Sequence, residues 1–258
     1  MRSPKISIVI PSYNKGKRIK ETLESIFNQN YSNIEVIIMD GDSVDETFTI
    51  VKTFIKKYPD LISWVSEKDD GQLDAVNRGI EKATGDIVTF INADDIYEKD
   101  AFNLVSSYFI ENPNALWFAG RSKVIDGNGK EIAKFVTWYK DFLFSFNSYQ
   151  LLLMANYLMQ PSIFLTRDIY KKYGPFTGTK KFITEYELWL NIGKTRMPFT
   201  THKVLSKFRI EPTTITKTLS SELLIEDYKI VKKYTDNKSI LFLHSLHNFA
   251  RMLIGRFI

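Results

Sequence analysis

The sequence contains no cysteine and no long apolar run. Because none of its 258 residues is a cysteine, disulfide bonds and thiolate chemistry are excluded, and a reducing compartment suits the chain. Since no stretch of about 18 apolar residues occurs, we expect no membrane-spanning helix. The first apolar run, residues 6–10, is too short for the core of a secretory signal peptide. We therefore expect a cytoplasmic protein.

Several nucleotide and nucleic-acid signatures are also missing. Neither G-x-G-x-x-G nor G-x-x-x-x-G-K-[ST] follows the first apolar run, which disfavours a dinucleotide-binding fold of the usual fingerprint and a P-loop nucleotidase. Zinc-finger spacings and basic runs interleaved with aromatics do not occur either, so nucleic acid is not an expected partner. The formal net charge of +5 favours anionic ligands or an anionic membrane surface.

Short apolar runs alternate with helical patterns over residues 1–95. The apolar, β-branched runs predict strands, and apolar positions three and four apart between them predict amphipathic helices. This alternation predicts an α/β fold, in which a mainly parallel sheet carries helices on its faces. The predicted strands are residues 6–10, 34–39, 62–66 and 87–91, and the predicted helices are residues 18–29, 46–58 and 73–83.

The second half of the chain has a different pattern. Asp126-Gly127-Asn128-Gly129 is turn sequence, so we expect residues 123–125 and 131–136 to form an antiparallel hairpin around it. The other predicted helices are residues 104–109, 183–192, 222–234 and 240–258, and the other predicted strands are residues 115–119 and 202–209. We expect one domain over residues 1–217, with halves at 1–98 and 99–217, and a helical segment at 218–258.

The stretch at residues 85–95 carries the strongest chemical signal. Its strand ends in Asn92-Ala93-Asp94-Asp95, and open α/β sheets bind ligands at the carboxyl ends of their strands. Adjacent carboxylates repel each other unless a cation lies near them, and Mg2+ and Mn2+ take oxygen ligands that include substrate phosphates. The pair therefore predicts a metal–diphosphate site, with capping of a following helix as the alternative.

Each of the four predicted strands ends in a polar loop. Because the carboxyl ends of parallel strands meet at one edge of a sheet, these loops should converge on one site. Three of the four carry carboxylates. The loops begin at Tyr13-Asn14, Asp40-Gly41-Asp42, Asp69-Asp70-Gly71-Gln72 and Asn92.

Two later segments are rich in apolar residues. Aromatic and long aliphatic side chains crowd residues 135–164, which predicts core packing for most of them and an acceptor groove or lipid contact for the remainder. Residues 240–258 form a basic amphipathic pattern with aromatics, which is typical of a membrane-surface helix or of a helix docked on the domain. His244 and His247 have no third partner in the sequence pattern, so a metal site there is not expected.

Four motifs, in order, resemble those of the family 2 glycosyltransferases, enzymes with a Rossmann-like GT-A fold. The likeness covers roughly residues 5–215, and it implies that residues 1–98 bind the nucleotide and residues 99–217 the acceptor. The motifs are S-I-V-I-P-S-Y-N at 7–14, D-G-D-S-V-D-E-T at 40–47, E-K-D-D-G-Q-L-D-A-V-N-R-G at 67–79, and A-T-G-D at 83–86 leading to N-A-D-D at 92–95.

The resemblance implies transfer of one sugar from a nucleotide-sugar, most often UDP-linked, with inversion at the anomeric carbon. The departing diphosphate gains negative charge, which a divalent ion, Mn2+ or Mg2+, stabilises. Asp94 and Asp95 match the family's metal-holding acids. The residues that the motifs place around the nucleotide-sugar are Pro11, Tyr13, Asn14, Asp40, Asp42, Asp69, Gly71, Gln72, Asp74, Asn77, Asn92, Ala93 and Asp94.

The resemblance also assigns a general base. The acceptor hydroxyl must lose a proton as it attacks, which requires a carboxylate within hydrogen-bond reach. The family carries an E-D pair before an L-W-L-like run, and here Thr184 replaces the first acid while Glu185 takes the place of the second. The family often has R-x-H after a later strand. Glu211 stands at the histidine position, which makes it a further candidate metal ligand.

The sequence lacks the Q-x-x-R-W motif of processive synthases. We therefore expect a single-sugar transferase that acts on a cell-envelope glycan or a lipid-linked glycan. The basic charge and the helix at 240–258 suggest that it works at the cytoplasmic face of the membrane. Two alternatives stay open: a sugar nucleotidyltransferase, and a non-catalytic protein that binds nucleotide-sugar or glycan.

Overall fold

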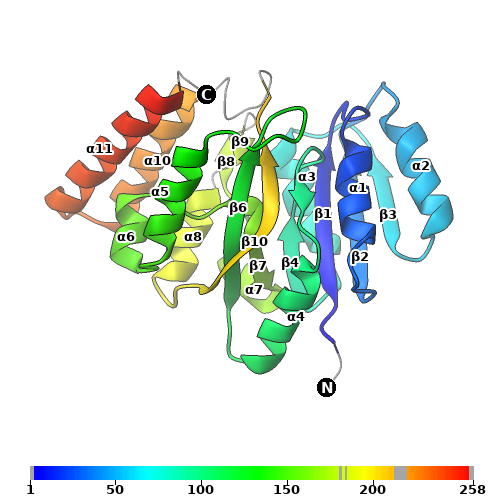
Figure 1. Cartoon of the computed structure of the whole chain (residues 1–258), viewed down its shortest axis with the longest axis horizontal. Coiled ribbons are helices and arrows are strands. Elements are labelled where there is room, and N and C mark those ends of the chain that lie inside the picture. Colours follow the sequence, from blue (N-terminus) through cyan, green and yellow to red (C-terminus); the bar gives the residue numbers. More distant parts are fainter. Residues whose placement is uncertain (1–2, 180–181, 184, 212–219, 256–258) are drawn as a thin grey trace.

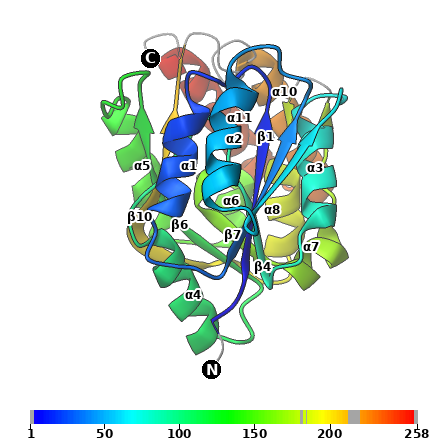
Figure 2. The ribbon, with the colours of Figure 1, turned by 90° about the vertical axis from the view of Figure 1, so that its right-hand side faces the viewer.

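A computed structural model describes residues 3–179, 182–183, 185–211 and 220–255. In this part of the chain one large sheet has the strand order β3-β2-β1-β4-β7-β6-β10-β5, and β8 and β9 form a separate ribbon. Helices cover both faces of the large sheet (Figure 1), with α1 and α2 on one side and α3 on the other (Figure 2). The predicted α/β class with a mainly parallel sheet is confirmed.

The first half follows the predicted alternation closely. Strand β1 pairs in parallel with β2 on one side and with β4 on the other, and β2 pairs in parallel with β3. Ile6 lies opposite both Ile34 and Ile87, which fixes the register. The elements are β1 (Ile6–Ser12), α1 (Ile19–Phe27), β2 (Ile34–Asp40), α2 (Thr47–Lys57), β3 (Ile62–Ser66), α3 (Gln72–Lys82) and β4 (Ile87–Phe90).

The second half extends the same sheet. Strand β7 is antiparallel to both β4 and β6, and β10 is parallel to β6. Strands β6 and β10 therefore run in the same direction as β1 to β4. The elements up to β7 are β5 (Ile96–Tyr97), α4 (Ala101–Glu111), β6 (Trp117–Ile125), α5 (Lys134–Phe144), α6 (Tyr149–Met154), η1 (Gln160–Ser162) and β7 (Ile163–Thr166). The later elements are α7 (Arg167–Tyr173), β8 (Gly178–Thr179), β9 (Phe182–Ile183), α8 (Glu185–Gly193) and β10 (Phe199–Arg209).

The predicted hairpin at residues 123–136 is wrong in its second arm. The turn itself forms, because the Gly129 amide donates to the carbonyl of Asp126 at 3.0 Å and Gly129 takes a φ of +79°. Beyond it, only an isolated bridge joins Glu131 to Ile125. Residues 134–136 instead begin helix α5, because their apolar side chains continue into a helical series of aromatics rather than alternating across a strand.

The core has two layers, one on each face of the sheet. Successive side chains of a strand point to opposite faces, so Ile8 packs in the layer that holds Leu23 of α1, whereas Val9 packs in the layer that holds Val76 of α3. All seven residues of β1 are buried, as expected for a strand covered on both faces.

Helices α10 (Ser220–Tyr234) and α11 (Lys238–Gly255) pack on the far side of the domain from β3 (Figure 1). Helix α11 contacts α10 and α6, and α10 contacts α8. His244 is fully buried, and its Nδ1 lies 3.1 Å from the carbonyl oxygen of Leu153. The described part of this segment is therefore docked on the domain. None of the helices in the described part of the chain combines the length and the hydropathy that a membrane-spanning helix needs.

Gly79 sets the distance between α3 and the sheet. A Cβ atom at this position would lie 2.4 Å from Cγ1 of Val9 and 3.0 Å from Cγ of Met39. Both neighbours are buried in the core, so neither can move aside cheaply. The absence of a side chain at Gly79 therefore lets α3 pack closely against β1 and β2.

We predict that Gly79→Val lowers the free energy of unfolding by about 2 kcal/mol or more, because overpacking a core costs about 1–3 kcal/mol. Urea denaturation measures the change. Glu81→Val is the matched control, since it places the same side chain at an exposed position of the same helix, where the loss is limited to a few tenths of a kcal/mol of helix propensity. Equal losses in the two variants would contradict the packing argument.

Candidate active site

Hydrogen bonds join the loops that follow β1 and β2 at one edge of the sheet. The Gly41 amide donates to the carbonyl of Ser12 at 2.9 Å, and the Val44 amide donates to Oδ1 of Asn14 at 3.0 Å. Asn14 has a left-handed backbone with φ of 51°, which turns the chain sharply after β1. The predicted convergence of strand-end loops is therefore confirmed for this pair.

Asp40 holds the corner between β2 and β3. Its buried carboxylate accepts hydrogen bonds from the Ser43 hydroxyl at 2.5 Å, the Ser43 amide at 2.9 Å and the Ser66 hydroxyl at 2.8 Å. Its carbonyl accepts from the Glu67 amide at 3.0 Å. Asp42 follows in an exposed, left-handed conformation with φ of 67°. Asp40 thus shapes the loop, while Asp42 is the carboxylate that faces solvent.

The end of β1 contributes one packed and one exposed ring. Pro11 is buried in the strand opposite Met39. Tyr13, the first residue after the strand, is 62% exposed. An exposed aromatic face next to the Asp40 corner offers a surface on which a flat base can stack.

The loop after β3 approaches the loops after β2 and β4. Asp69 accepts a hydrogen bond from the Gly71 amide at 2.9 Å, and a side chain at Gly41 would meet the Asp69 carboxylate at 2.9 Å. Glycine at position 41 therefore allows the two loops to touch. Gly71 has φ of 102°, and α3 begins at the next residue. The side-chain Nε2 of Gln72, the first residue of α3, donates a hydrogen bond to Oδ1 of Asn92.

Two predicted donor-binding residues on α3 are engaged elsewhere. Asp74 forms an ion pair with Arg78 at 3.3 Å. The Asn77 side chain is fully used in packing, because its amide nitrogen donates to the Phe176 carbonyl at 3.0 Å and its Oδ1 accepts from the Phe176 amide at 3.0 Å and the Tyr170 hydroxyl at 2.8 Å. The structure therefore uses Asn77 to hold the segment after α7 rather than to face the strand-end loops.

Asp94 and Asp95 lie where β4 ends, and both are buried. Asp95 has no exposed surface and Asp94 is 7% exposed, while Ala93 beside them is also fully buried. Oδ1 of Asp95 accepts from the backbone amide of Arg209 at 2.8 Å, and its Oδ2 accepts from the side-chain Nδ2 of Asn92 at 3.1 Å. Both oxygens of Asp95 are therefore committed to the protein, which leaves Asp94 as the carboxylate able to receive a cation.

Lys15 occupies the cation position at Asp94. Its ammonium forms an ion pair with Oδ2 of Asp94. Burial raises the pKa of Asp95 well above its ordinary value, the neighbouring charge of Asp94 adds to that shift, and the Arg209 amide, Asn92 and Lys15 oppose it. A positive charge next to this pair therefore stabilises its ionised form.

Arg209 is the anchor of this corner. Its guanidinium is almost fully buried and donates to the carbonyl of Asp94 at 2.8 Å, to those of Asp126 and Gly127 at 3.1 and 3.0 Å, and to Glu21 at 2.6 Å. One side chain thereby joins the ends of β4, β6 and β10 to helix α1. Sequence reasoning missed this role, because the partners of Arg209 lie between 82 and 188 residues away and no local pattern marks them.

Glu211 does not join the aspartates. Its Oε1 accepts from the guanidinium of Arg18, at 2.9 Å from Nε. Among the described residues, no group of three or more histidine, cysteine or acidic side chains is placed to hold a metal ion. Asp94 nevertheless fits a partial site, because Mg2+ and Mn2+ are commonly bound by one or two carboxylates together with substrate phosphates.

Glu185 is the first residue of α8, and it behaves differently from Glu187. Burial raises the pKa of Glu185 to about 7, and the charge of Asp227 raises it further while that of Lys140 lowers it. Glu187 instead pairs with Lys233 at 2.8 Å and accepts from Thr177 at 2.7 Å. The two carboxylates, two residues apart on the helix, thus have different surroundings. A carboxyl with a pKa near neutrality is suited to accept a proton.

We predict that Arg209→Met lowers the free energy of unfolding by about 3 kcal/mol or more, because breaking a buried, hydrogen-bonded charge network typically costs about 3–5 kcal/mol. Arg18→Met is the matched control, since the Arg18–Glu211 pair is about one quarter exposed and a pair of that kind contributes about 1 kcal/mol or less. Urea denaturation separates the two. A small loss for Arg209→Met would show that the corner is held by other contacts.

Comparison with known proteins assigns the family. The model of the family "Glycosyl transferase family 2" matches residues 7–174. An uncharacterized glycosyltransferase of Rickettsia typhi is 27% identical over 261 residues, which span 96% of this chain and 78% of the relative. An uncharacterized glycosyltransferase of Haemophilus influenzae is 31% identical over a region that spans 65% of this chain and 67% of the relative.

Solved structures share the fold at low identity. The mannosyltransferase PcManGT from Pyrobaculum calidifontis, in complex with GDP-Man and Mn2+, superposes with a TM-score of 0.69 at 19% identity over 95% of this chain and 70% of its own. Residues 1–349 of S. aureus TarS, in complex with UDP-GlcNAc, give a TM-score of 0.65 at 18% identity over 88% of this chain and 65% of that one. The family match covers more than half of the sequence, and the chain belongs to the family 2 glycosyltransferases.

Proposed function

We propose that the protein transfers one sugar, with inversion, from a UDP-sugar to a glycan or a lipid-linked glycan. The observation that carries the proposal is the corner at the end of β4, where buried Asp94 and Asp95 lie beside an exposed tyrosine and a cluster of polar loops. Two proteins with the same fold support a nucleotide-sugar donor, since their structures hold UDP-GlcNAc and GDP-Man with Mn2+.

The donor would lie along the edge formed by the strand-end loops. The base would stack on Tyr13 next to the Asp40 corner, and Asp42 would reach the ribose. The diphosphate would pass the backbone amides around Gly71, at the start of α3, because helix N-termini favour anions. The amides of Gln72 and Asn92, which are bonded to each other, would border the sugar.

A divalent ion, Mn2+ or Mg2+, would complete the site at Asp94 together with the donor's phosphates. It would offset the charge that develops on the departing diphosphate. In this protein Lys15 holds the same carboxylate, so binding of the metal would require the ammonium to move. Lys15 would then lie within reach of the diphosphate, where its positive charge would offset part of the diphosphate's negative charge.

The second chemical requirement is a base for the acceptor hydroxyl. Glu185 would accept that proton as the oxygen attacks the anomeric carbon from the side opposite the diphosphate. Attack from that side inverts the configuration at this carbon. Asp227 keeps the carboxylate basic and Lys140 limits how far its pKa rises, so Glu185 can be ionised at neutral pH and still take up a proton.

The apolar helices suggest where the protein works. Phe242, Leu246 and Phe249 of α11 are exposed although the helix is docked on its other side. We propose that this face contacts the cytoplasmic surface of a membrane. Two other functions would use much of the same site: a sugar nucleotidyltransferase, and a non-catalytic nucleotide-sugar or glycan-binding protein. A near-neutral carboxyl at Glu185 favours the transferase, since neither alternative needs a base there.

We predict that Asp94→Asn weakens Mn2+ binding in the presence of UDP by roughly 10–100-fold, the scale seen when support for a metal site is lost. Electron paramagnetic resonance of free Mn2+ measures the affinity. Lys15→Met should strengthen Mn2+ binding in the absence of nucleotide, because it removes the ammonium that pairs with the Asp94 carboxylate. Asp60→Asn, an exposed carboxylate before β3, is the control and should change nothing. Unchanged Mn2+ binding in Asp94→Asn would contradict the proposed metal position.

We predict that kcat/KM falls as the pH drops below about 7, because Glu185 accepts a proton only when ionised and its pKa is about 7. Glu185→Gln should lower kcat by about 100–10,000-fold and leave UDP binding intact. Glu187→Gln is the control, since that carboxylate pairs with Lys233. Steady-state kinetics across pH 5.5–8.5 measure both effects, and full turnover in Glu185→Gln would exclude it as the base.

A further inference from the structure

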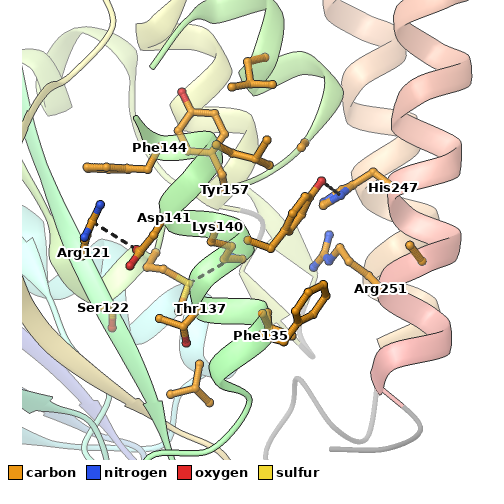
Figure 3. Close-up of a pocket in the computed structure, with 18 of the residues that line it drawn as sticks. Arg121, Ser122, Phe135, Thr137, Lys140, Asp141, Phe144, Tyr157, His247 and Arg251 are labelled. Carbon is orange, nitrogen blue, oxygen red and sulfur yellow. Dashed lines mark hydrogen bonds and ion pairs between the residues drawn. The ribbon is translucent and has the colours of Figure 1, made fainter. Parts of the chain in front are cut away.

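A cavity borders the ends of β6 and β10, where Val124, Phe208 and Ile210 line it. It has a volume of about 570 Å3 and lies between α5, strands β6 and β10, and α11. That volume is within the range of about 300–1,000 Å3 typical of small-molecule sites. Its walls are mostly apolar (Figure 3), with Leu143, Phe144, Tyr157, Phe208, Leu243 and Leu246 among the lining residues.

Three cationic side chains line this cavity, those of Arg121, Lys140 and Arg251. Arg121 pairs with Asp141, which also lines the cavity, at 3.5 Å. Lys140 lies on α5 and Arg251 on the neighbouring helix α11, and both line the cavity (Figure 3). Arg251 pairs with Asp227 at 2.7 Å. Over the described part of the chain, the hydrogen-bond partner of the Lys140 ammonium is the sulfur of Met159 at 3.1 Å, which is a weak acceptor.

The surroundings of Lys140 leave its charge poorly compensated. Burial lowers the pKa of Lys140 to about 7, and Arg251 lowers it further, while Asp227 and Glu185 raise it. An ammonium inside an apolar cavity is costly unless an anion reaches it. An anionic ligand would therefore gain more from Lys140 than from an exposed lysine.

Three lining residues, Arg121, Thr137 and His247, have a buried polar atom without a hydrogen bond among the described residues, although Nε of Arg121 has its ion pair with Asp141. The other two atoms are Nε2 of His247 and Oγ1 of Thr137. Nδ1 of the same histidine lies 3.1 Å from the Tyr139 hydroxyl. A buried polar atom left unsatisfied costs about 1–3 kcal/mol. A ligand that carries oxygen atoms into the cavity would satisfy these groups.

The cavity opens onto an apolar surface. Phe135, Leu243 and Leu246 line it and are exposed as well. Trp138 and Phe142 of α5, and Phe146 just beyond its end, continue that surface outward, and their rings contact one another in series. Aromatic and aliphatic side chains of this kind are typical of helices that lie at a membrane surface. Exposed apolar side chains thus surround the opening of the cavity that Lys140 lines.

We infer that this cavity binds an amphiphile with one apolar chain and a phosphate, the chain along the apolar lining and the phosphate between Lys140 and Arg251. That the amphiphile also carries the sugar acceptor rests on the proposed function. The link is Glu185, whose charge acts on Lys140. An apolar peptide or a second copy of the chain fits less well, since either would bury the ammonium of Lys140 without an opposite charge.

The test is calorimetric titration with farnesyl phosphate, with farnesol, and with inorganic phosphate, below the concentration at which micelles form. We expect farnesyl phosphate to bind at least tenfold more tightly than farnesol, and inorganic phosphate to show no binding. Lys140→Met should remove the advantage of the phosphate while farnesol binding persists. Lys134→Met is the matched control, because this exposed lysine is on the same helix and outside the cavity; it should behave as the natural chain.

A second variant tests where the apolar chain of the ligand lies. Ala250 lines the cavity from α11 and is exposed, so Ala250→Trp should fill the opening without disturbing the core and should weaken both farnesyl ligands at least tenfold. Equal binding of farnesyl phosphate by the natural chain, Lys140→Met and Ala250→Trp would overturn the inference. So would self-association through this face, seen by light scattering, with no amphiphile bound.

The outcome is separable from that of the proposed function. UDP binding with Mn2+ is measured on the same samples. Retained UDP binding without farnesyl phosphate binding would overturn the cavity assignment alone. Loss of UDP binding in the natural chain would overturn the proposed function, whatever the cavity binds.

Discussion

Two adjacent carboxylates buried at the end of β4 are the constraint on which the structure depends. Such a pair is unfavourable in an apolar core unless donors and cations surround it. The protein meets that need with the Arg209 amide at Asp95 and with Lys15 at Asp94. The Arg209 side chain then fixes the neighbouring turns. The site and the junction between the two halves of the sheet therefore share one set of contacts.

The strand-end loops were predictable from the sequence for a simple reason. Buried parallel strands are nearly continuous apolar runs, so their ends are visible wherever polar residues begin, as at Tyr13, Asp40 and Asn92. Parallel direction then places these ends together without any knowledge of contacts.

Other features depend on contacts that the sequence does not display. Asn77 looked like a ligand residue, but its amide is used by Phe176 and Tyr170, more than 90 residues away. Glu211 matches a metal-ligand position of the family, yet its carboxylate pairs with the guanidinium of Arg18, the residue before α1. The prediction of a strand after Gly129 was wrong, because a turn sequence does not determine the structure of the residues that follow it. Local patterns thus predicted the elements and their ends, while long-range pairing decided which side chains remained available.

The two parts of the molecule present different chemistry on one framework. The strand-end edge offers carboxylates, amides and an aromatic ring, which suit a nucleotide diphosphate. The cavity beside α11 offers apolar walls and cations, which suit an amphiphile. Glu185 is electrostatically coupled to Lys140 and Asp227, so the pKa of the proposed base depends on the charges of the second region.

The central claim is that the buried aspartates serve a nucleoside diphosphate. It is tested most directly by calorimetric titration of the natural chain with UDP, GDP and CDP, each with and without Mn2+. We expect that UDP binds and that its binding requires Mn2+. Failure of all three nucleotides to bind under either condition would mean that Asp94 and Asp95 only hold the fold together.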